Sequence, residues 1–223
     1  MSAVATACTC QSIGAPPEIR QCPEHFSFWH GDRRLTSYSS MLKAIYPAKA
    51  EALAKIPPAI LAHAAERGKR VDRYASDYAR GLDIEVNPAD FEDGAMFAEV
   101  LERVRIFVEW FDHVKPEVIG VQQICYSLDD GIAAMKDFDF RIEGAMWVVD
   151  LKCTATPAWE WKLQLGCHYA LSASASYCDP LLGILHINPK LYPRTNGVEL
   201  IEYSTEPCLK AFQHALDWWK EIQ

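Results

Sequence analysis

The stretch Asp137–Lys152, DFDFRIEGAMWVVDLK, constrains the fold of this chain more than any other. It predicts two adjacent strands joined by a tight turn at Glu143-Gly144, and the second strand contains the apolar, β-prone run Met146–Val149. This strand ends in an acid and a base two positions apart, Asp150 and Lys152. Side chains with this spacing point to the same face of a strand, so the carboxylate and the ammonium are expected to share one pocket.

Asp137 adds a second acid thirteen residues before Asp150, on the neighbouring strand. Phosphodiester hydrolysis needs a positioned water, neutralised charge at the phosphate and help for the leaving oxygen, and Mg²⁺ ions held by carboxylates supply most of this. A lysine beside them can activate the water or stabilise developing charge. The arrangement is therefore typical of a metal-dependent phosphodiester-cleaving site.

Two alternatives stay open at this point. An Asp-x-Lys pair at a strand end occurs often by chance and can be a surface ion pair that contributes little. Asp139 shares a face with Asp137 and competes for its place, and Glu117, before the preceding strand, is a weaker candidate acid.

Length, composition and charge set broad limits. The 223 residues suit one domain of ordinary size, and no run approaches the roughly 20 apolar residues of a membrane span. The first residues lack the pattern of a secretory signal, so we expect a cytoplasmic protein. A net charge of −8 argues against a nonspecific nucleic-acid coat protein. It does not exclude a nuclease, whose acids bind metal ions while basic residues line one groove.

The order of expected elements predicts a mixed α/β domain with a central sheet flanked by helices. Gly68, inside the second expected helix, predicts a bend or a close approach. From the N-terminus we expect an irregular module over 1–34, helices over 41–45, 58–81 and 91–114, a strand over 118–126, the hairpin 136–152, a helix over 159–175, strands over 181–187 and 198–203, and a helix over 207–222.

Several ordered motifs resemble one nuclease family. Asp137, then Asp150-Leu151-Lys152-Cys153-Thr154, then Gln164-Leu165 resembles the PD-(D/E)XK nuclease superfamily, and in particular its RecB-like phage and prophage exonuclease branch. The upstream segment Glu66–Val71, ERGKRV, matches a helical motif of that branch, and Ser37 with Leu42–Ile45 is similar to its opening motif. The resemblance spans roughly residues 36–175.

The resemblance implies a restriction-endonuclease-like fold over 35–223 and a Mg²⁺- or Mn²⁺-dependent deoxyribonuclease, most simply an exonuclease of phage or prophage recombination or repair. Asp137 and Asp150 would bind the metal ion with the backbone carbonyl of Leu151, Lys152 would position or activate the water, and Gln164 would orient the lysine or contact DNA. DNA is the implied partner, together with a single-strand-annealing or recombinase protein, in a bacterial or phage-infected cell.

The chain departs from the family pattern at two positions. Asp72 stands where the branch usually has a metal-binding histidine; aspartate is also a hard oxygen ligand, but it could instead be a solvated acid paired with a nearby arginine. His168 stands where tyrosine is expected, with Tyr169 one place later, about 100° further around the helix. These departures motivate an alternative: a nucleic-acid-binding protein that keeps the fold without catalysis. The candidate nucleic-acid contacts are Arg67, Lys69, Arg70, His168 and Tyr169.

Four potential metal ligands lie near the N-terminus: Cys8, Cys10, Cys22 and His25. Zn²⁺ favours four such ligands and can order a segment that has little core of its own, so we expect a structural zinc site within residues 1–34. His30 is a spare ligand. An iron–sulfur cluster involving Cys167, Cys178 and Cys208 is less consistent with their wide spacing.

Aromatic pairs offer a further possibility. Trp159 with Trp161, and Trp218 with Trp219, could stack on nucleic-acid bases. Packing into the core is the commoner role of tryptophan on amphipathic helices, so both interpretations stay open.

Overall fold

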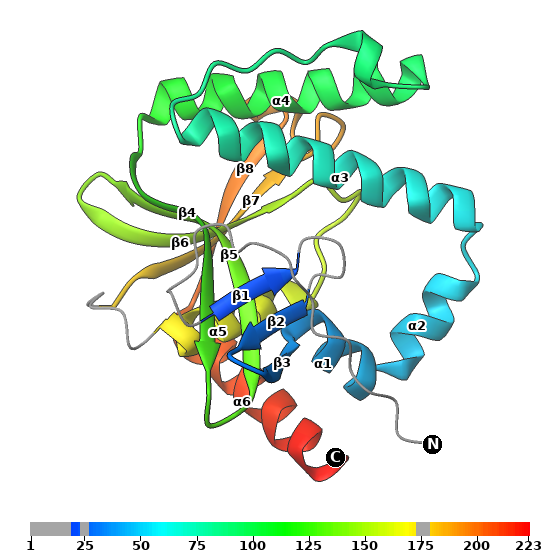
Figure 1. Ribbon diagram of the computed structural model, residues 1–223. Helices are drawn as coiled ribbons and strands as arrows, with labels where there is room; N and C mark the ends of the chain where they lie inside the picture. The colour runs from blue at the N-terminus through cyan, green and yellow to red at the C-terminus, as the bar shows by residue number, and fades with distance from the viewer. Residues whose placement is uncertain (1–18, 23–26, 173–178) are drawn as a thin grey trace.

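The computed structural model describes residues 19–22, 27–172 and 179–223, which form a mixed α/β architecture (Figure 1). The described strands make one eight-stranded sheet in the order β1-β2-β3-β5-β6-β7-β8, with β4 paired to β5. The sheet is mixed, because β3 runs parallel to β5 and β6 parallel to β7 while the other pairs are antiparallel. The predicted fold class, a central mixed sheet flanked by helices, is confirmed at this level.

The strands are β1 (Ile19–Cys22), β2 (Ser27–His30), β3 (Arg33–Ser37), β4 (Glu117–Ser127), β5 (Ile132–Ile142), β6 (Ala145–Lys152), β7 (Leu181–Ile187) and β8 (Val198–Tyr203). The α-helices are α1 (Tyr38–Ile45), α2 (Pro47–Ala54), α3 (Pro58–Ala79), α4 (Gly94–Val114), α5 (Glu160–Ser172) and α6 (Thr205–Glu221). Short 3₁₀ turns, η1 (Pro88–Asp90) and η2 (Pro193–Thr195), precede α4 and β8.

The β5–β6 hairpin forms as the sequence predicts. Glu143 and Gly144 both have positive φ angles, 50° and 85°, which is the backbone of the two-residue turn that matches the twist of antiparallel strands. Ladder pairing then runs inward from Ile142↔Ala145 to Phe138↔Val149. The pairing stops there, because β5 continues beside β4 and β6 continues beside β7. Asp137 and Asp150 are therefore the first residues at which the two strands are no longer paired.

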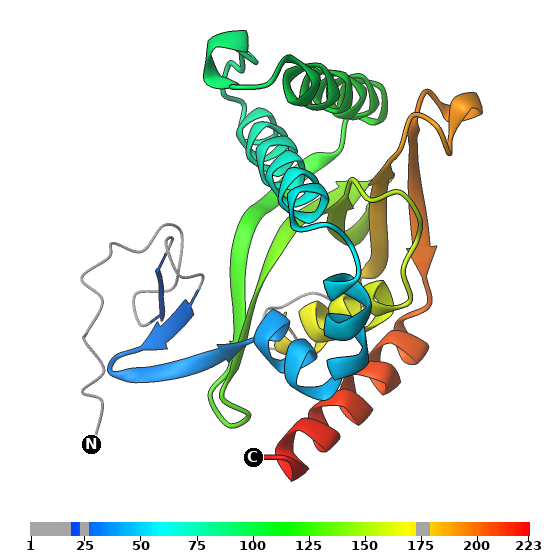
Figure 2. The ribbon, with the colours of Figure 1, turned by 90° about the vertical axis from the view of Figure 1, so that its right-hand side faces the viewer.

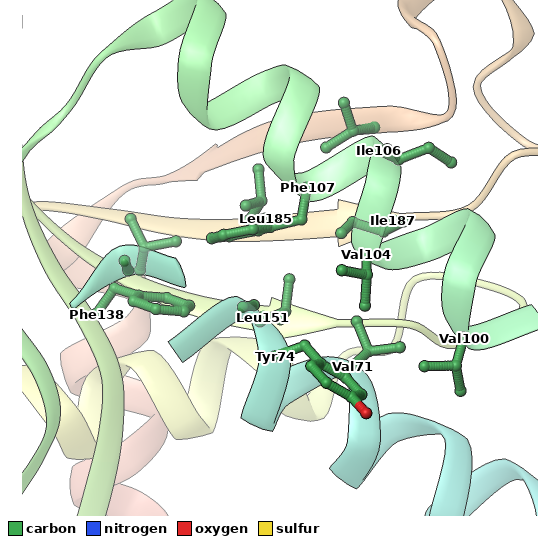
Figure 3. Close-up of a cluster of buried hydrophobic side chains, with 14 of the residues drawn as sticks. Val71, Tyr74, Val100, Val104, Ile106, Phe107, Phe138, Leu151, Leu185 and Ile187 are labelled. Atoms are coloured by element: carbon green, nitrogen blue, oxygen red, sulfur yellow. The ribbon is translucent and has the colours of Figure 1, made fainter. Parts of the chain in front are cut away.

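Helices α3 and α4 cover one face of the sheet (Figures 1 and 2). Figure 3 shows the core between them and the strands, where Phe107 of α4 stacks on Phe138 of β5 and Val71 and Tyr74 of α3 lie near Leu151 of β6. Phe107, Phe138 and Val71 are fully buried. Burying aromatic and branched side chains of this size contributes about 1.5–3 kcal/mol each, so this core holds α3 against the strands of the hairpin.

Helices α5 and α6 cover the opposite face and pack closely on each other. Val148 of β6 and Leu182 of β7 meet Leu165 of α5 on this side. Because side chains alternate along a strand, Asp150 points to the same side as Val148, towards α5. The alternation of side chains along β6 therefore directs the Asp150 carboxylate into the interior, where it is fully buried.

The N-terminal part differs from the irregular segment that the sequence predicts. β1 and β2 form an antiparallel ribbon, and β3 joins this ribbon to β5 through Thr36↔Ile132. Ile19, Phe28 and Leu35 are buried together, so one apolar residue from each of the three strands stabilises the ribbon despite the turn-forming residues between the strands. Of the predicted zinc ligands, Cys22 lies buried in β1; Cys8, Cys10 and His25 lie outside the described residues, and the zinc site stays a prediction.

Two further sequence expectations can be compared with the helices. α3 begins at Pro58, where proline is well tolerated because the first turn needs no N–H partner, as predicted. The close approach expected at Gly68 is wrong, since no atom lies within 4 Å of a Cβ added there, and α3 runs through this position without a break. Among the described residues, none of the helices has the length and apolar character needed to cross a membrane.

Gly166 and Gly68 provide a matched test of helix packing. A Cβ added to Gly166 of α5 would lie 2.1 Å from the carbonyl oxygen of Cys208 in α6. We therefore expect Gly166→Ala to lower the free energy of unfolding by about 2 kcal/mol or more, measured by chemical denaturation. Gly68→Ala, with open space around it, should raise it by about 0.5–1 kcal/mol. Equal effects of the two substitutions would contradict the α5–α6 packing.

Candidate active site

The candidate site lies where β5 and β6 part. Asp137 and Asp150 are the first residues beyond the last ladder pair, Phe138↔Val149. The Leu151 N–H donates a hydrogen bond to Oδ2 of Asp137 at 2.8 Å. A side chain thus satisfies a backbone donor where the two strands no longer pair, and this fixes the first carboxylate beside the second.

Asp150 is held by two polar side chains. Its Oδ1 accepts a hydrogen bond from Nε2 of Gln164 on α5 at 2.7 Å, and its Oδ2 contacts the ammonium of Lys152 on the same strand. Asp150 and Lys152 share a face of β6, as their spacing predicts. Lys152 keeps 21% of its side chain exposed whereas Asp150 keeps 1%, so the lysine forms the accessible edge of the pair.

Asp72 brings a third carboxylate from α3. Its Oδ2 accepts a hydrogen bond from Nε2 of Gln122 at 3.0 Å, and Oε1 of Gln122 in turn accepts one from Arg80. Gln122 lies within β4 but has a positive φ of 50°, an uncommon backbone state for a non-glycine residue. The Oδ1 atom of Asp72 is buried and has no hydrogen-bond partner among the described residues.

The three carboxylates affect one another electrostatically. Burial, reinforced by repulsion from Asp150, raises the pKa of Asp72 to about 6. Burial also raises the pKa of Asp137 well above its usual value, and Asp150 and Asp72 raise it further. Burial lowers the pKa of Lys152, but the attraction of Asp150 and Asp137 outweighs it and the net shift is upward. Lys152 is thus a cation close to two acids, Asp72 and Asp137, whose pKa values are both raised.

The donor set suits a hard divalent cation, although the carboxylates are not gathered into a ready-made metal site. Within residues 19–22, 27–172 and 179–223, no three His, Cys, Asp or Glu side chains converge as metal ligands. Gln122, the Leu151 N–H, Gln164 and Lys152 each engage a carboxylate oxygen instead. The unsatisfied Oδ1 of Asp72 and the mutual repulsion of the acids are the features that a Mg²⁺ or Mn²⁺ ion would relieve.

Three grooves meet at these residues. A groove of about 730 Å³ between α3 and the segment after β6 contains Asp72 and Lys152. A second, of about 680 Å³ between α1, α2 and α5, contains Lys152 and Gln164. A third, of about 800 Å³ beside β4 and the N-terminal ribbon, contains Asp72 and Gln164. Each groove shares a polar residue with the next, so an extended ligand could reach the carboxylates from three directions.

The arginines predicted to contact nucleic acid are engaged within the protein. Arg67 donates hydrogen bonds to Glu99 on α4 and to the backbone carbonyl of Cys153. Arg70 donates to Glu66 and lies over the ring of Phe91 at 4.5 Å. These contacts tie α3 to α4 and to the segment after β6. Lys69 is exposed on α3 but does not line the three grooves.

His168 and Tyr169 have different surroundings on α5, and their contacts with nucleic acid stay predictions. His168 is 1% exposed, and burial lowers its pKa to about 4, so the imidazole is neutral. Tyr169, one position later on α5, packs against the cluster around Trp161 and Leu182, so it does not replace the tyrosine of the family pattern. The rotation expected from a one-residue offset is what separates the two side chains.

The competing acids have other partners. Asp139 is 1% exposed and accepts a hydrogen bond from the buried Lys136 ammonium, which neutralises its charge. Glu117 pairs with Arg141 on the exposed surface at the turn end of the sheet. The structure therefore groups Asp137, and not Asp139 or Glu117, with Asp150.

The segment after Lys152 is fastened by residues that sequence reasoning missed. Asn188 donates from Nδ2 to the carbonyls of Thr154 and Ala155, at 3.1 and 2.8 Å. Nε2 of the buried His186 also lies 2.9 Å from the Thr154 carbonyl, with its Nδ1 2.8 Å from the Tyr192 hydroxyl. The available signal was the pair of polar residues that ends the apolar strand β7 before Pro189.

Replacing Asp72 with asparagine separates stability from cation binding. A carboxyl whose pKa is raised by folding stabilises the protein in its protonated form, and this contribution is lost as the pH rises through about 6. At pH 8 without divalent cations, Asp72→Asn should therefore raise the free energy of unfolding by about 1–3 kcal/mol. The gain should shrink below pH 6.

Thermal and chemical denaturation measure this effect. Mg²⁺ should stabilise the wild type and have little effect on Asp72→Asn. The exposed Asp83→Asn variant is the control and should change stability by less than about 0.5 kcal/mol. A loss of stability in metal-free Asp72→Asn at pH 8 would contradict the electrostatic account.

Asn188→Ala should loosen the segment that follows Lys152. The substitution removes the hydrogen bonds to Thr154 and Ala155 and two to the N–H groups of Lys190 and Leu191. We expect faster amide hydrogen exchange over 153–158 and a loss of about 1–3 kcal/mol of stability. Asn87→Ala, which removes one exposed capping bond, should leave exchange over 153–158 unchanged. Equal exchange in both variants would show that Asn188 does not anchor the segment.

Comparisons with known proteins show similarity only at the level of solved structures. No family model matches the chain, and no curated protein matches it. Among solved structures, it is similar to the crystal structure of a "putative exonuclease" from Eubacterium rectale, with 15% sequence identity and a TM-score of 0.48. The match covers 70% of this chain and 66% of that protein, so the chain spans slightly less than two thirds of its length.

Proposed function

We propose that the protein is a divalent-cation-dependent hydrolase of DNA phosphodiester bonds. Its DNA substrate would bind in the two grooves that share Lys152. The observation that supports this most strongly is the grouping of Asp72, Asp137 and Asp150 around Lys152 where β5 and β6 part. Structural ion pairs do not need one buried and two half-buried acids for one lysine, and acids with raised pKa values in a cleft are typical of functional sites.

Each residue has a role in this proposal. Asp137 and Asp150, with Asp72 from α3 and the Leu151 carbonyl, would hold Mg²⁺ or Mn²⁺. The bound ion would neutralise the phosphate and lower the pKa of a water molecule. Lys152, kept charged by the surrounding acids, would stabilise negative charge that develops on the phosphate. Gln164 holds Asp150 through its Oδ1 and so keeps the carboxylate oriented.

Asp72 fits the position of a metal ligand better in space than the sequence alone indicates. The charge of Asp72 contributes to the raised pKa of Asp137, and the charge of Lys152 opposes the upward shift in the pKa of Asp72. Gln122 fixes one of its oxygens and leaves the other without a partner. Aspartate in place of histidine provides a harder ligand, so we expect a preference for Mg²⁺ or Mn²⁺ over softer ions.

The test is cleavage of labelled linear duplex and single-stranded DNA. The wild type should degrade DNA with Mg²⁺ or Mn²⁺ and stop when the ion is chelated. Lys152→Ala and Asp150→Asn should lower the rate by about 100-fold or more. Lys210→Ala, an exposed lysine paired with Glu206 on α6, is the control and should cleave like the wild type.

The outcomes also separate the non-catalytic alternative. DNA binding without cleavage by the wild type, in either ion, would favour a nucleic-acid-binding protein that lacks catalysis. Cleavage that survives in Lys152→Ala would show that another site, or a contaminant, is responsible and would overturn the proposal.

A further inference from the structure

Three aromatic side chains gather on the surface beside the second groove. Tyr46, between α1 and α2, meets Trp159 at 4.7 Å and Trp218 of α6 at 6.0 Å between ring centroids. Both contacts are edge to face, with interplanar angles of 62° and 75°. We call Tyr46, Trp159 and Trp218 the aromatic platform. It joins the ends of three segments that are far apart in the sequence.

The two indoles of the aromatic platform are unusually exposed. Trp159 is 52% and Trp218 is 47% accessible to solvent, whereas Trp161 and Trp219, their neighbours in the sequence, are buried. Core packing therefore accounts for Trp161 and Trp219, but it does not explain why Trp159 and Trp218 are large apolar residues at exposed positions. Exposed apolar clusters on a folded protein mark interaction sites more often than chance would allow.

The aromatic platform is continuous with the candidate active site. The groove of about 680 Å³ is lined by Tyr46 and by Ala158, next to Trp159, and also by Lys152 and Gln164 of the candidate active site. Its volume lies within the roughly 300–1,000 Å³ of pockets that bind small organic ligands. A flexible chain that lies on the platform could therefore follow this groove to the carboxylates.

The charge of the groove indicates what kind of chain it accepts. Lys43 of α1 and Lys49 of α2 both line it, and Lys49 pairs with Glu160 while Lys43 is exposed. Lysines along a groove that also presents flat aromatic faces match a chain of phosphates and bases. A purely apolar protein segment would form no ion pair or hydrogen bond with Lys43, Lys49 or Lys152.

We propose that the aromatic platform binds unpaired bases of single-stranded DNA and guides that strand along the groove to Lys152; this rests on the proposed function and specifies its substrate. Stacking needs a base with a free face, which a base inside a duplex lacks. The platform therefore selects single-stranded segments or frayed ends, independently of sequence, because every base has a π face.

Binding is tested in the Lys152→Ala background, so that the DNA stays intact. Fluorescence anisotropy compares a labelled oligothymidylate with an abasic oligomer of the same length. The parent should bind oligothymidylate more tightly, and adding Trp159→Ala should weaken that binding by about tenfold or more while leaving the abasic oligomer unchanged. Trp159→Phe should restore most of the affinity, and Leu101→Ala, an exposed apolar residue on α4, is the matched control.

A second measurement uses the catalytically intact protein and the p-nitrophenyl ester of thymidine 5′-monophosphate. This small phosphodiester has no second base to stack on the platform and reports on the candidate active site, so wild type and the matched control Leu101→Ala should hydrolyse it equally. Equal binding of oligothymidylate by the parent and the Trp159→Ala variant would overturn the platform and leave these aromatics as a protein-docking surface. Failure of the wild type to cleave both DNA and the small ester with Mg²⁺ or Mn²⁺ would instead refute the proposed hydrolase, whatever the binding result.

Discussion

The parting of β5 and β6 beyond Phe138↔Val149 is the constraint on which the site depends. Paired strands have no room for a ligand between them, and an unpaired strand end leaves buried N–H groups that must find acceptors. Here the carboxylate of Asp137 accepts from the Leu151 N–H. The Asp137 carboxylate thus satisfies a backbone donor, and the same hydrogen bond holds it beside Asp150.

Placing three acids close together between α3 and α5 destabilises the folded protein, and contacts elsewhere in the molecule offset this loss of stability. The aromatic and aliphatic core under α3 and α4 fixes Asp72 from one side of the sheet, and α5 fixes Gln164 from the other. Gln122, Gln164 and Lys152 then engage carboxylate oxygens that would otherwise be unsatisfied. Under the proposed function, this cost in stability is the kind that functional sites commonly carry, and a bound cation would offset it.

Local sequence patterns predicted the parts of this site that depend on strand geometry. The turn at Glu143-Gly144 and the shared face of Asp150 and Lys152 follow from residue preferences and the two-residue period of a strand. The role of Gln122 could not be predicted, because its positive φ and its reach to Asp72 arise from tertiary packing. Likewise, the sequence around Arg67 does not indicate its partner Glu99, which comes from α4. The pairing of β3 with β5 joins segments that are far apart in the sequence, so local residue preferences could not predict it either.

Calorimetric titration with Mn²⁺ tests the central claim most directly, because it asks whether the carboxylates act together as a cation site. We expect the wild type to bind Mn²⁺, and Asp137→Asn and Asp150→Asn each to abolish or strongly weaken binding. The buried but lysine-paired Asp139 provides the comparison: Asp139→Asn, if it remains folded, should still bind the ion. No binding by the wild type, or binding that is unaffected by Asp150→Asn, would contradict the account.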